Sequence, residues 1–188
     1  ADIAAAKAEI FDGMDKDGLA ILNRDDAFIE YLATRAQAAG VNDIVTFGRH
    51  EDADFRLLDV EPAAAGQMVD ASLRGTASRF ALGMRNAHWA HNSMAVLAAV
   101  YGLGFDPADA ASYLHDFNDL PGRGAVLSGA FDARLITLID DSYNAGPRSM
   151  QAALAGLHST APQILILSDM LELGDGSAAA HAALAPPI

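Results

Sequence analysis

Cysteine is absent from the 188 residues of this chain. The sequence therefore cannot form a disulfide framework, and it cannot hold zinc or an iron–sulfur cluster through thiolates. No apolar run approaches the roughly 18 residues that a membrane-spanning helix needs, and no charged segment followed by an apolar one indicates a secretory signal. These absences favour a cytoplasmic protein whose core is stabilised by packing alone, and they predict no membrane insertion.

Basic residues are also scarce. Twelve Lys and Arg stand against 25 Asp and Glu, which gives a formal net charge of −13. A field of that sign repels nucleic acid and anionic lipid. The charge balance argues against a nucleic-acid-binding module and leaves a small-molecule enzyme open, because backbone N–H groups can still build one local anion site.

The common catalytic signatures are missing as well. The sequence contains no G-x-x-x-x-G-K-[ST] phosphate loop, no G-x-G-x-x-G, no H-E-x-x-H and no G-x-S-x-G. The six histidines lack metal-ligand spacing. The chain begins at Ala1 in a helix-like stretch and stops directly after another such stretch. We therefore expect an internal piece of a larger protein, without a complete catalytic apparatus.

The first half of the chain predicts an α/β fold. Helices and short apolar strands alternate as in a parallel sheet, over residues 3–12, 19–22, 27–39 and 44–48. Asp25 or Asp26 is a suitable cap for the second helix. Three short segments separated by glycines then predict a small antiparallel meander, over residues 55–61, 67–73 and 78–82.

Two further helices are expected after the meander. One spans residues 88–103 and carries an apolar face from Met94 to Tyr101. The other begins at the Asp106-Pro107 pair, a cap followed by proline, and runs to about residue 117.

A linker-like segment, residues 120–124 (L-P-G-R-G), follows these helices. We expect the break between two structural units here. Beyond it, strand–loop–helix occurs twice, which is a Rossmann-like pattern with functional loops at the carboxyl ends of the strands. Buried strands are expected over 134–140 and 163–167, and helices over 148–157 and 177–184.

Two polar loops follow these strands. Residues 140–147 supply two carboxylates, a hydroxyl and an amide, which could hold ribose hydroxyls, a metal-bound water or a phosphate. The same residue types are good helix caps, so residues 140–147 have a second interpretation as a helix-capping turn. The second loop, residues 168–174, has a simpler interpretation as an acidic loop before a helix. The pattern alone leaves these alternatives open.

Three residues of the first half are candidates for chemistry. Lys7 lies among alanines on a helix, where a partly desolvated amine could add carbon dioxide and ligate magnesium as a carbamate. A solvated helix lysine is the simpler interpretation. His88 and Asn92, one helical turn apart, could contact the edge of a base, or they could cap the helix or make polar core contacts.

Taken in order, five motifs resemble the Mur ligase family. They are A-A-K-A-E-I-F at residues 5–11, H-x-x-x-N at 88–92, L-P-G-R at 120–123, D-D-S-Y-N-A at 140–145 and D-M-x-E-L-G at 169–174. The resemblance covers essentially the whole chain. The last two motifs together point to the member of the family that adds D-alanyl-D-alanine.

The resemblance implies an α/β fold in two partial domains. Residues 1–121 are similar to the second half of the central ATP-binding domain, with a partial parallel sheet and a small antiparallel one. Residues 122–188 are similar to the first half of the carboxyl-terminal Rossmann-like domain. The whole enzyme would use ATP and Mg²⁺ to join D-alanyl-D-alanine to UDP-N-acetylmuramoyl-tripeptide through an acyl phosphate, in peptidoglycan precursor synthesis. It is expected to act as a monomer, and the piece alone is expected to be inactive.

In the first partial domain, the resemblance assigns roles to three residues. Lys7 matches a catalytic lysine that is carbamylated and helps to hold magnesium, so it is a metal ligand only in that form. His88 and Asn92 match the start of a helix that contacts adenine.

In the second partial domain, Arg123 matches a catalytic arginine that reaches the terminal phosphate, and Asp141 matches an aspartate that binds ribose. Tyr143 and Asn144 lie in the stretch that approaches the phosphates and the incoming amine. All four therefore count as candidates for binding the nucleotide.

Three positions depart from the family pattern. Ser168 stands where glycine is usual, Gly146 replaces an asparagine, and Trp89 replaces the asparagine after His88. Two other functions stay open: a sibling Mur ligase with another amino-acid substrate, and a noncatalytic module that binds an anionic or sugar ligand.

Overall fold

The computed structural model describes residues 2–132, 134–155 and 163–185, which form two compact units. The first unit extends to Asp119 and the second begins at Leu120. The division therefore lies at the edge of the linker-like segment. None of the helices in these ranges is both long and apolar enough to cross a membrane.

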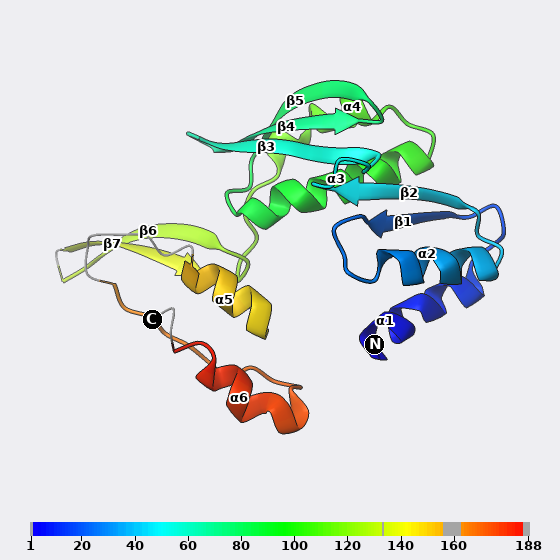
Figure 1. Ribbon diagram of the computed structural model, residues 1–188. Helices are drawn as coiled ribbons and strands as arrows, with labels where there is room; N and C mark the ends of the chain where they lie inside the picture. The colour runs from blue at the N-terminus through cyan, green and yellow to red at the C-terminus, as the bar shows by residue number, and fades with distance from the viewer. Residues whose placement is uncertain (1, 133, 156–162, 186–188) are drawn as a thin grey trace. The chain divides into compact units, whose positions relative to one another are not determined.

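The first unit is built on a five-stranded sheet with the order β1-β2-β3-β4-β5 (Figure 1). Its strands are β1 (Leu19–Asn23), β2 (Asp43–Gly48), β3 (Phe55–Ala63), β4 (Gly66–Leu73) and β5 (Thr76–Leu82). Its helices are α1 (Asp2–Ala8), α2 (Ile29–Ala38), α3 (Ala87–Gly102) and α4 (Pro107–Ala111), with 3-10 turns η1 (Glu9–Gly13) and η2 (Leu114–Asp116).

The pairing of neighbouring strands changes once across the sheet, from parallel to antiparallel. β1–β2 and β2–β3 are parallel pairs, whereas β3–β4 and β4–β5 are antiparallel. The turn between β4 and β5 consists of Arg74 and Gly75, both with positive φ, 51° and 84°, as a two-residue hairpin turn requires. The predicted parallel segment followed by an antiparallel meander is confirmed.

Two apolar layers enclose the parallel part of the sheet. Side chains alternate along β1, so that Ala20 and Leu22 join the cluster formed with α1 and α2, while Leu19 and Ile21 pack against the other cluster. That second cluster contains Met94, Leu97 and Ala98 of α3. The expected buried face of α3 is confirmed for these residues, whereas Tyr101 is 37% exposed. Both faces of the parallel strands are covered.

Two predictions about helix starts had different outcomes. Asp106 caps α4 as predicted, with its carboxylate accepting the Ala108 N–H at 2.9 Å. Neither Asp25 nor Asp26 caps α2, which begins at Ile29 without a side-chain cap. Asp26 instead accepts the Phe28 N–H at 2.8 Å in the preceding turn.

The second unit contains a two-stranded antiparallel sheet, β6 (Ala125–Phe131) and β7 (Arg134–Asp140). Helices α5 (Pro147–Ala155) and α6 (Ser177–Ala182) follow, with a 3-10 turn η3 (Gly174–Gly176) before α6. Its buried cluster comprises Leu154, Met170 and Leu184. The α/β fold class therefore holds for the chain, with a mixed five-stranded sheet and a small antiparallel one.

The second unit also corrects two predictions. Residues 163–167 are not a strand, and Ile164 and Ile166 are about nine-tenths exposed. β7 forms at the predicted place, but its apolar side chains are exposed, with Leu135 at 91%. An apolar run becomes a buried strand only when neighbouring strands and helices cover it. Among the described residues, β6 is the one strand that pairs with β7.

Candidate functional site

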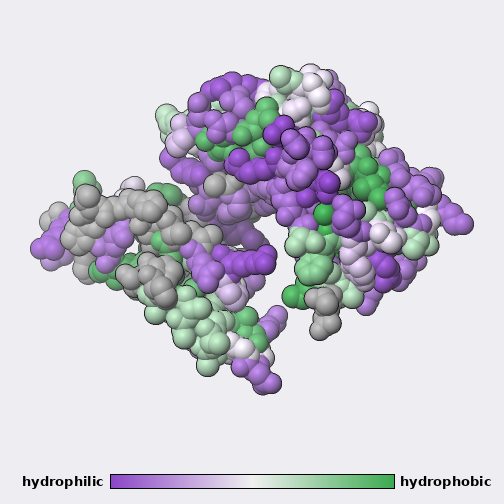
Figure 2. Space-filling model, in the orientation of Figure 1, coloured by the Kyte–Doolittle hydropathy of each residue, from purple (hydrophilic) through white to green (hydrophobic). Residues whose placement is uncertain are grey.

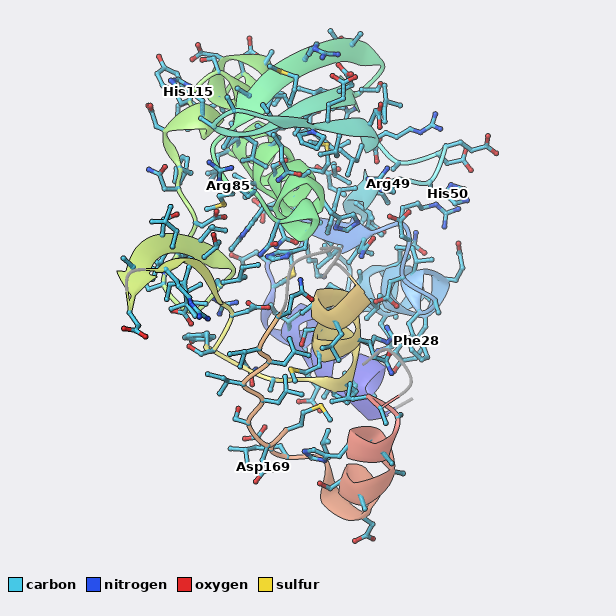
Figure 3. The ribbon with its side chains drawn as sticks, turned by 90° about the vertical axis from the view of Figure 1, so that its left-hand side faces the viewer. Phe28, Arg49, His50, Arg85, His115 and Asp169 are labelled. Carbon is cyan, nitrogen blue, oxygen red and sulfur yellow. The ribbon has the colours of Figure 1, made fainter. Side chains whose placement is uncertain are left out.

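The carboxyl ends of β1 and β2 meet at the side chain of Asp25. Its carboxylate accepts the Arg49 N–H at 2.7 Å and the His50 N–H at 2.8 Å, both from the loop after β2. Figure 3 shows Arg49 and His50 on this loop. Gly48 precedes them with φ of 147°, and a Cβ there would lie 2.7 Å from an Asp25 oxygen. Glycine at position 48 therefore allows Asp25 to reach the loop.

Asp25 also contacts α3. The Nε2 atom of His91 lies 3.2 Å from the same carboxylate, and the His91 ring packs edge-on against Phe47 with the ring centroids 5.3 Å apart. Partial burial raises the pKa of Asp25, but the hydrogen bonds from Arg49, His50 and His91 outweigh it and hold the pKa below its usual value. An ionised carboxylate can only accept, so His91 donates from Nε2.

The predicted pair His88 and Asn92 lies on this first part of α3. Both side chains are exposed, and His91 lies between them in the sequence. The His88 ring packs against Trp89 with the ring centroids 4.7 Å apart. The indole N–H of Trp89 is buried, and no hydrogen-bond partner for it exists among the described residues. Trp89, one of the residues that depart from the family pattern, is therefore half-buried beside His88, a candidate for the adenine contact.

Lys7 lies on α1, with its side chain exposed. Within the described ranges, no three His, Asp or Glu side chains converge as metal ligands. The described residues consequently do not fit a magnesium site by themselves, and Lys7 is the single residue of this chain for which a metal role is implied.

In the second unit, the loop after β7 is tied to the linker-like segment. Asp140 accepts the Gly122 N–H at 3.0 Å with one oxygen, and the Ser142 hydroxyl at 2.6 Å with the other. The Tyr143 N–H donates to the Gly122 carbonyl at 2.9 Å, and the Gly124 N–H donates to the Asp140 carbonyl at 2.8 Å. The linker-like segment and the loop after β7 are therefore joined by hydrogen bonds between residues 122–124 and 140–143, and we call this structure the platform.

This platform brings together two of the predicted site residues. The Arg123 guanidinium lies over the Tyr143 ring, 4.0 Å from its centroid, a distance typical of a cation–π contact. Asp141 and Asn144 are exposed on either side of Tyr143. Arg123, Asp141, Tyr143 and Asn144 are thus presented by one short stretch of backbone, with polar groups free to meet a ligand.

The motif at residues 169–174 forms a second fixed loop. The buried Met170 donates its N–H to Nε2 of His181 at 3.0 Å, and Nδ1 of His181 lies 2.8 Å from the Ser177 carbonyl oxygen. Asp169, labelled in Figure 3, is 92% exposed at its side chain. The interpretation as an acidic loop before a helix therefore describes this segment well.

Two depressions on the first unit contain none of the predicted site residues. One, of about 390 Å³, is lined by Arg49, Gln67 and Arg85 among others. The other, of about 240 Å³, lies beside Arg74 and Tyr101. Figure 2 shows hydrophilic side chains over most of the visible face of this unit. The predicted site residues are thus exposed side chains, on helices α1 and α3 in the first unit and on loops in the second.

Sequence reasoning missed the two aspartates that organise these loops. Asp25 was interpreted as a helix cap, and Asp140 as one of several polar loop residues. Each lies at or just after the end of a strand, which was the available signal. The Asp25 partners lie 24 to 66 residues away in the sequence, and the Gly122 partner of Asp140 lies 18 residues away.

We expect acid to loosen the platform of the second unit. The hydrogen bonds from Ser142, from its hydroxyl first and its backbone N–H second, hold the pKa of Asp140 below its usual value. Burial opposes them, and the hydrogen bond from the Gly122 N–H adds to them. The stabilisation is therefore complete above the unfolded pKa of about 3.9 and is lost as the pH falls through the lower folded value.

Urea unfolding of the chain and of the D140N variant between about pH 3 and pH 7 measures this effect. The wild-type chain is expected to be the more stable at pH 7, and the difference is expected to shrink below about pH 4. A difference that stays constant over this range contradicts the role of the Asp140 carboxylate.

Comparison with known proteins matches residues 1–100 to the Mur ligase middle domain. The UDP-N-acetylmuramoyl-tripeptide–D-alanyl-D-alanine ligase of Bacillus subtilis is 32% identical over 92% of this chain and 36% of its own length. The UDP-N-acetylmuramate–L-alanine ligase of Streptomyces avermitilis is 30% identical over 88% of this chain and 35% of its own. The chain thus spans little more than a third of these relatives.

A solved structure is similar in fold over nearly the whole chain. The crystal structure of MurF ligase from Thermotoga maritima in complex with ADP superposes with a TM-score of 0.76 and 25% identity. It covers 98% of this chain, which in turn corresponds to 41% of that one.

Proposed function

Because the chain belongs to the Mur ligase family, we propose that it is part of an ATP-dependent ligase that adds D-alanyl-D-alanine to UDP-N-acetylmuramoyl-tripeptide. In this proposal, residues 1–121 belong to the central ATP-binding domain and residues 122–188 to the carboxyl-terminal domain. The platform that carries Arg123, Asp141 and Tyr143 is the single observation that supports the proposal most directly. The ligase of Bacillus subtilis, which is named for this reaction, is similar over most of the chain.

The proposed reaction has two steps. An oxygen of the tripeptide carboxylate attacks the terminal phosphorus of ATP, and ADP leaves, so that an acyl phosphate forms. The amine of D-alanyl-D-alanine then attacks the acyl carbon and loses a proton, and inorganic phosphate leaves as the amide forms. Both steps concentrate negative charge on phosphate oxygens, which a positioned guanidinium stabilises.

Each exposed site residue has a task in this scheme. Asp141 accepts hydrogen bonds from the ribose hydroxyls, and Asn92 with His88 contacts the adenine edge. Arg123 leaves its contact with the Tyr143 ring and binds the terminal phosphate, which is a stronger partner for a guanidinium than an aromatic face. Tyr143 and Asn144 line the approach of the amine.

Magnesium would neutralise phosphate charge in such a ligase. Lys7, as a carbamate, is the residue of this chain proposed to help hold it. Among the described residues, no group of three or more His, Asp or Glu side chains gathers to complete such a site.

One alternative has a specific observation in its favour. The similarity to the L-alanine ligase of Streptomyces avermitilis is 30% over 88% of the chain, which is close to the similarity shown by the D-alanyl-D-alanine ligase. A sibling ligase that joins L-alanine to UDP-N-acetylmuramate is therefore the second candidate.

A segment exchange tests both candidates. We expect this chain, placed in the Bacillus subtilis ligase in place of the matching segment, to support phosphate release that depends on ATP and D-alanyl-D-alanine. Within that chimera, Asp141→Ala is expected to lower kcat/KM for ATP by about 10- to 100-fold, the worth of one or two lost hydrogen bonds. Asp175→Ala, another exposed aspartate, serves as the matched control.

The same exchange into the Streptomyces avermitilis ligase supplies the contrast. The sibling ligase would be favoured over our proposal if the Streptomyces avermitilis chimera is active with L-alanine and the Bacillus subtilis chimera is inactive with D-alanyl-D-alanine. Full ATP-dependent activity of the Asp141→Ala chimera would instead contradict the role of this aspartate.

A further inference from the structure

We infer that Asp25 is a positioning residue, which fixes the start of α3 against the loops after β1 and β2 and so sets the geometry of the face that carries His88 and Asn92. The functional part of this inference rests on the proposed nucleotide-binding function. The structural part, that Asp25 holds His91, does not.

The first support is that Asp25 joins three elements. Its oxygens accept N–H groups of Arg49 and His50 after β2, and the imidazole of His91 in α3, while Asp25 itself follows β1. The Arg24 N–H donates to the Phe47 carbonyl at 2.7 Å, so the two strand ends are also joined by backbone. Removing the Asp25 carboxylate therefore releases α3 without separating the strands.

The second support is the place of this contact in the fold. In α/β sheets, ligands bind beyond the carboxyl ends of the parallel strands, and Asp25 lies at that edge. His91 is three residues after His88 and directly before Asn92, so all three lie on neighbouring parts of the helix surface. The His91 contact with Asp25 therefore determines how far the exposed pair stands from the strand ends.

The third support is that the site tolerates little change. Asp25 and His91 are mostly covered, with side-chain exposures of 32% and 25%. A methyl group on Gly48 would lie within 3 Å of the Asp25 carboxylate. Asparagine keeps the size of Asp25 but turns an amino group either toward the His50 N–H or toward both the Arg49 N–H and the His91 Nε2–H, all of which need an acceptor.

The neighbouring carboxylate, Asp54, provides a matched control. Asp54 accepts the N–H and the hydroxyl of Thr46 in β2, each at 2.8 Å. It thus holds the β2–β3 connection, and in the part of the chain that the structure describes no hydrogen bond joins its carboxylate to α3. D54N removes a comparable set of hydrogen bonds, and we expect it to lower stability without moving α3.

The experiment compares the 188-residue chain with its D25N, D54N and H91F variants by NMR. In the wild-type chain, the ¹⁵N signals of His91 are expected to show the proton on Nε2. In D25N this signature and the amide signals of residues 88–92 are expected to shift, while in D54N they stay. H91F keeps an aromatic ring beside Phe47 but removes the N–H that reaches Asp25, and it decides the question if D25N does not fold.

Titration with ADP supplies the functional readout. We expect the wild-type chain to bind with a Kd of about 1 mM, since adenine and ribose contacts alone remain. D25N and H91F are expected to raise this Kd by about tenfold, a loss of about 1.4 kcal/mol, and D54N to leave it unchanged.

The outcomes separate the two ideas. Unchanged His91 and amide signals in D25N would overturn the positioning role, whatever the affinity. If those signals shift while ADP affinity stays the same in D25N and H91F, the link from position to binding is overturned. If the wild-type chain does not bind ADP at all, the proposed nucleotide function fails, and the NMR signals still decide what Asp25 holds.

Discussion

Phe55→Ala is expected to lower the free energy of unfolding of the first unit by about 3–5 kcal/mol. The Phe55 side chain is completely buried, and it is among the largest fully buried side chains of the core. It starts β3 at the point where the sheet changes direction, paired with Phe47 on one side and Leu73 on the other. Its ring also lies 5.9 Å from that of Tyr101 in α3.

The cost has two physical parts. Truncation to alanine removes the transfer free energy of the ring, and it leaves a cavity between the sheet and α3, which cannot collapse because both elements are held by hydrogen bonds. Chemical denaturation followed by circular dichroism measures the change. Phe105→Ala is the matched control, because Phe105 is 68% exposed and its loss is expected to cost less than about 0.5 kcal/mol. Equal effects of the two substitutions would contradict the placement of Phe55 in the core.

Gly66→Ala is expected to destabilise the same unit by more than about 3 kcal/mol, or to prevent folding. Gly66 begins β4 with φ of 94°, and a Cβ at this position would overlap the carbonyl oxygen of Leu82 and the backbone of Gly83. Backbone atoms cannot rotate away as side chains do. The substitution therefore has to separate the β3–β4 hairpin from the end of β5.

Gly75→Ala separates steric overlap from backbone strain. Gly75 also has positive φ, 84°, but a Cβ there meets no heavy atom within 4 Å. Its substitution is expected to cost about 1–2 kcal/mol, the usual strain of a left-handed backbone for an L residue. Thermal unfolding of both variants gives the comparison. Similar losses for Gly66→Ala and Gly75→Ala would show that the contact with Leu82 does not limit the fold.

The elements that the sequence predicts well are those whose signal is local. The meander, α3 and the Asp106 cap depend on periodicity, glycine spacing or a residue two positions away, and all three are confirmed. β6 was not predicted, because Ala125–Phe131 contains Ser128 and Gly129 and shows no alternation of apolar and polar residues. Residues 163–167 have an apolar run typical of a strand, but strand formation also needs a free edge of a sheet in reach.

The candidate site shows the same difference between local signals, which the sequence reports, and distant contacts, which it does not. His88, Asn92, Arg123 and Asp141 were selected from motifs, and their roles stay predictions; the structure adds that Arg123 and Tyr143 lie together. Asp25 has a local interpretation as a cap and a different long-range use. Its carboxylate accepts from groups 24, 25 and 66 residues further along the chain. A rule for helix capping considers only the next two or three residues, so it cannot report partners this far along the chain.

The change of direction in the five-stranded sheet has a consequence for the order in which the chain folds. β3, β4 and β5 are joined by short turns, so their pairing closes small loops at little entropic cost. Leu19 pairs with Asp43 across the whole of α2, and that parallel pair has to wait for a longer closure. We therefore expect the meander to form early, and β2 and then β1 to join it at β3. Asp25 meets the loop after β2 and the His91 ring only once β1 is in place, so this part of the candidate site is expected to be completed late.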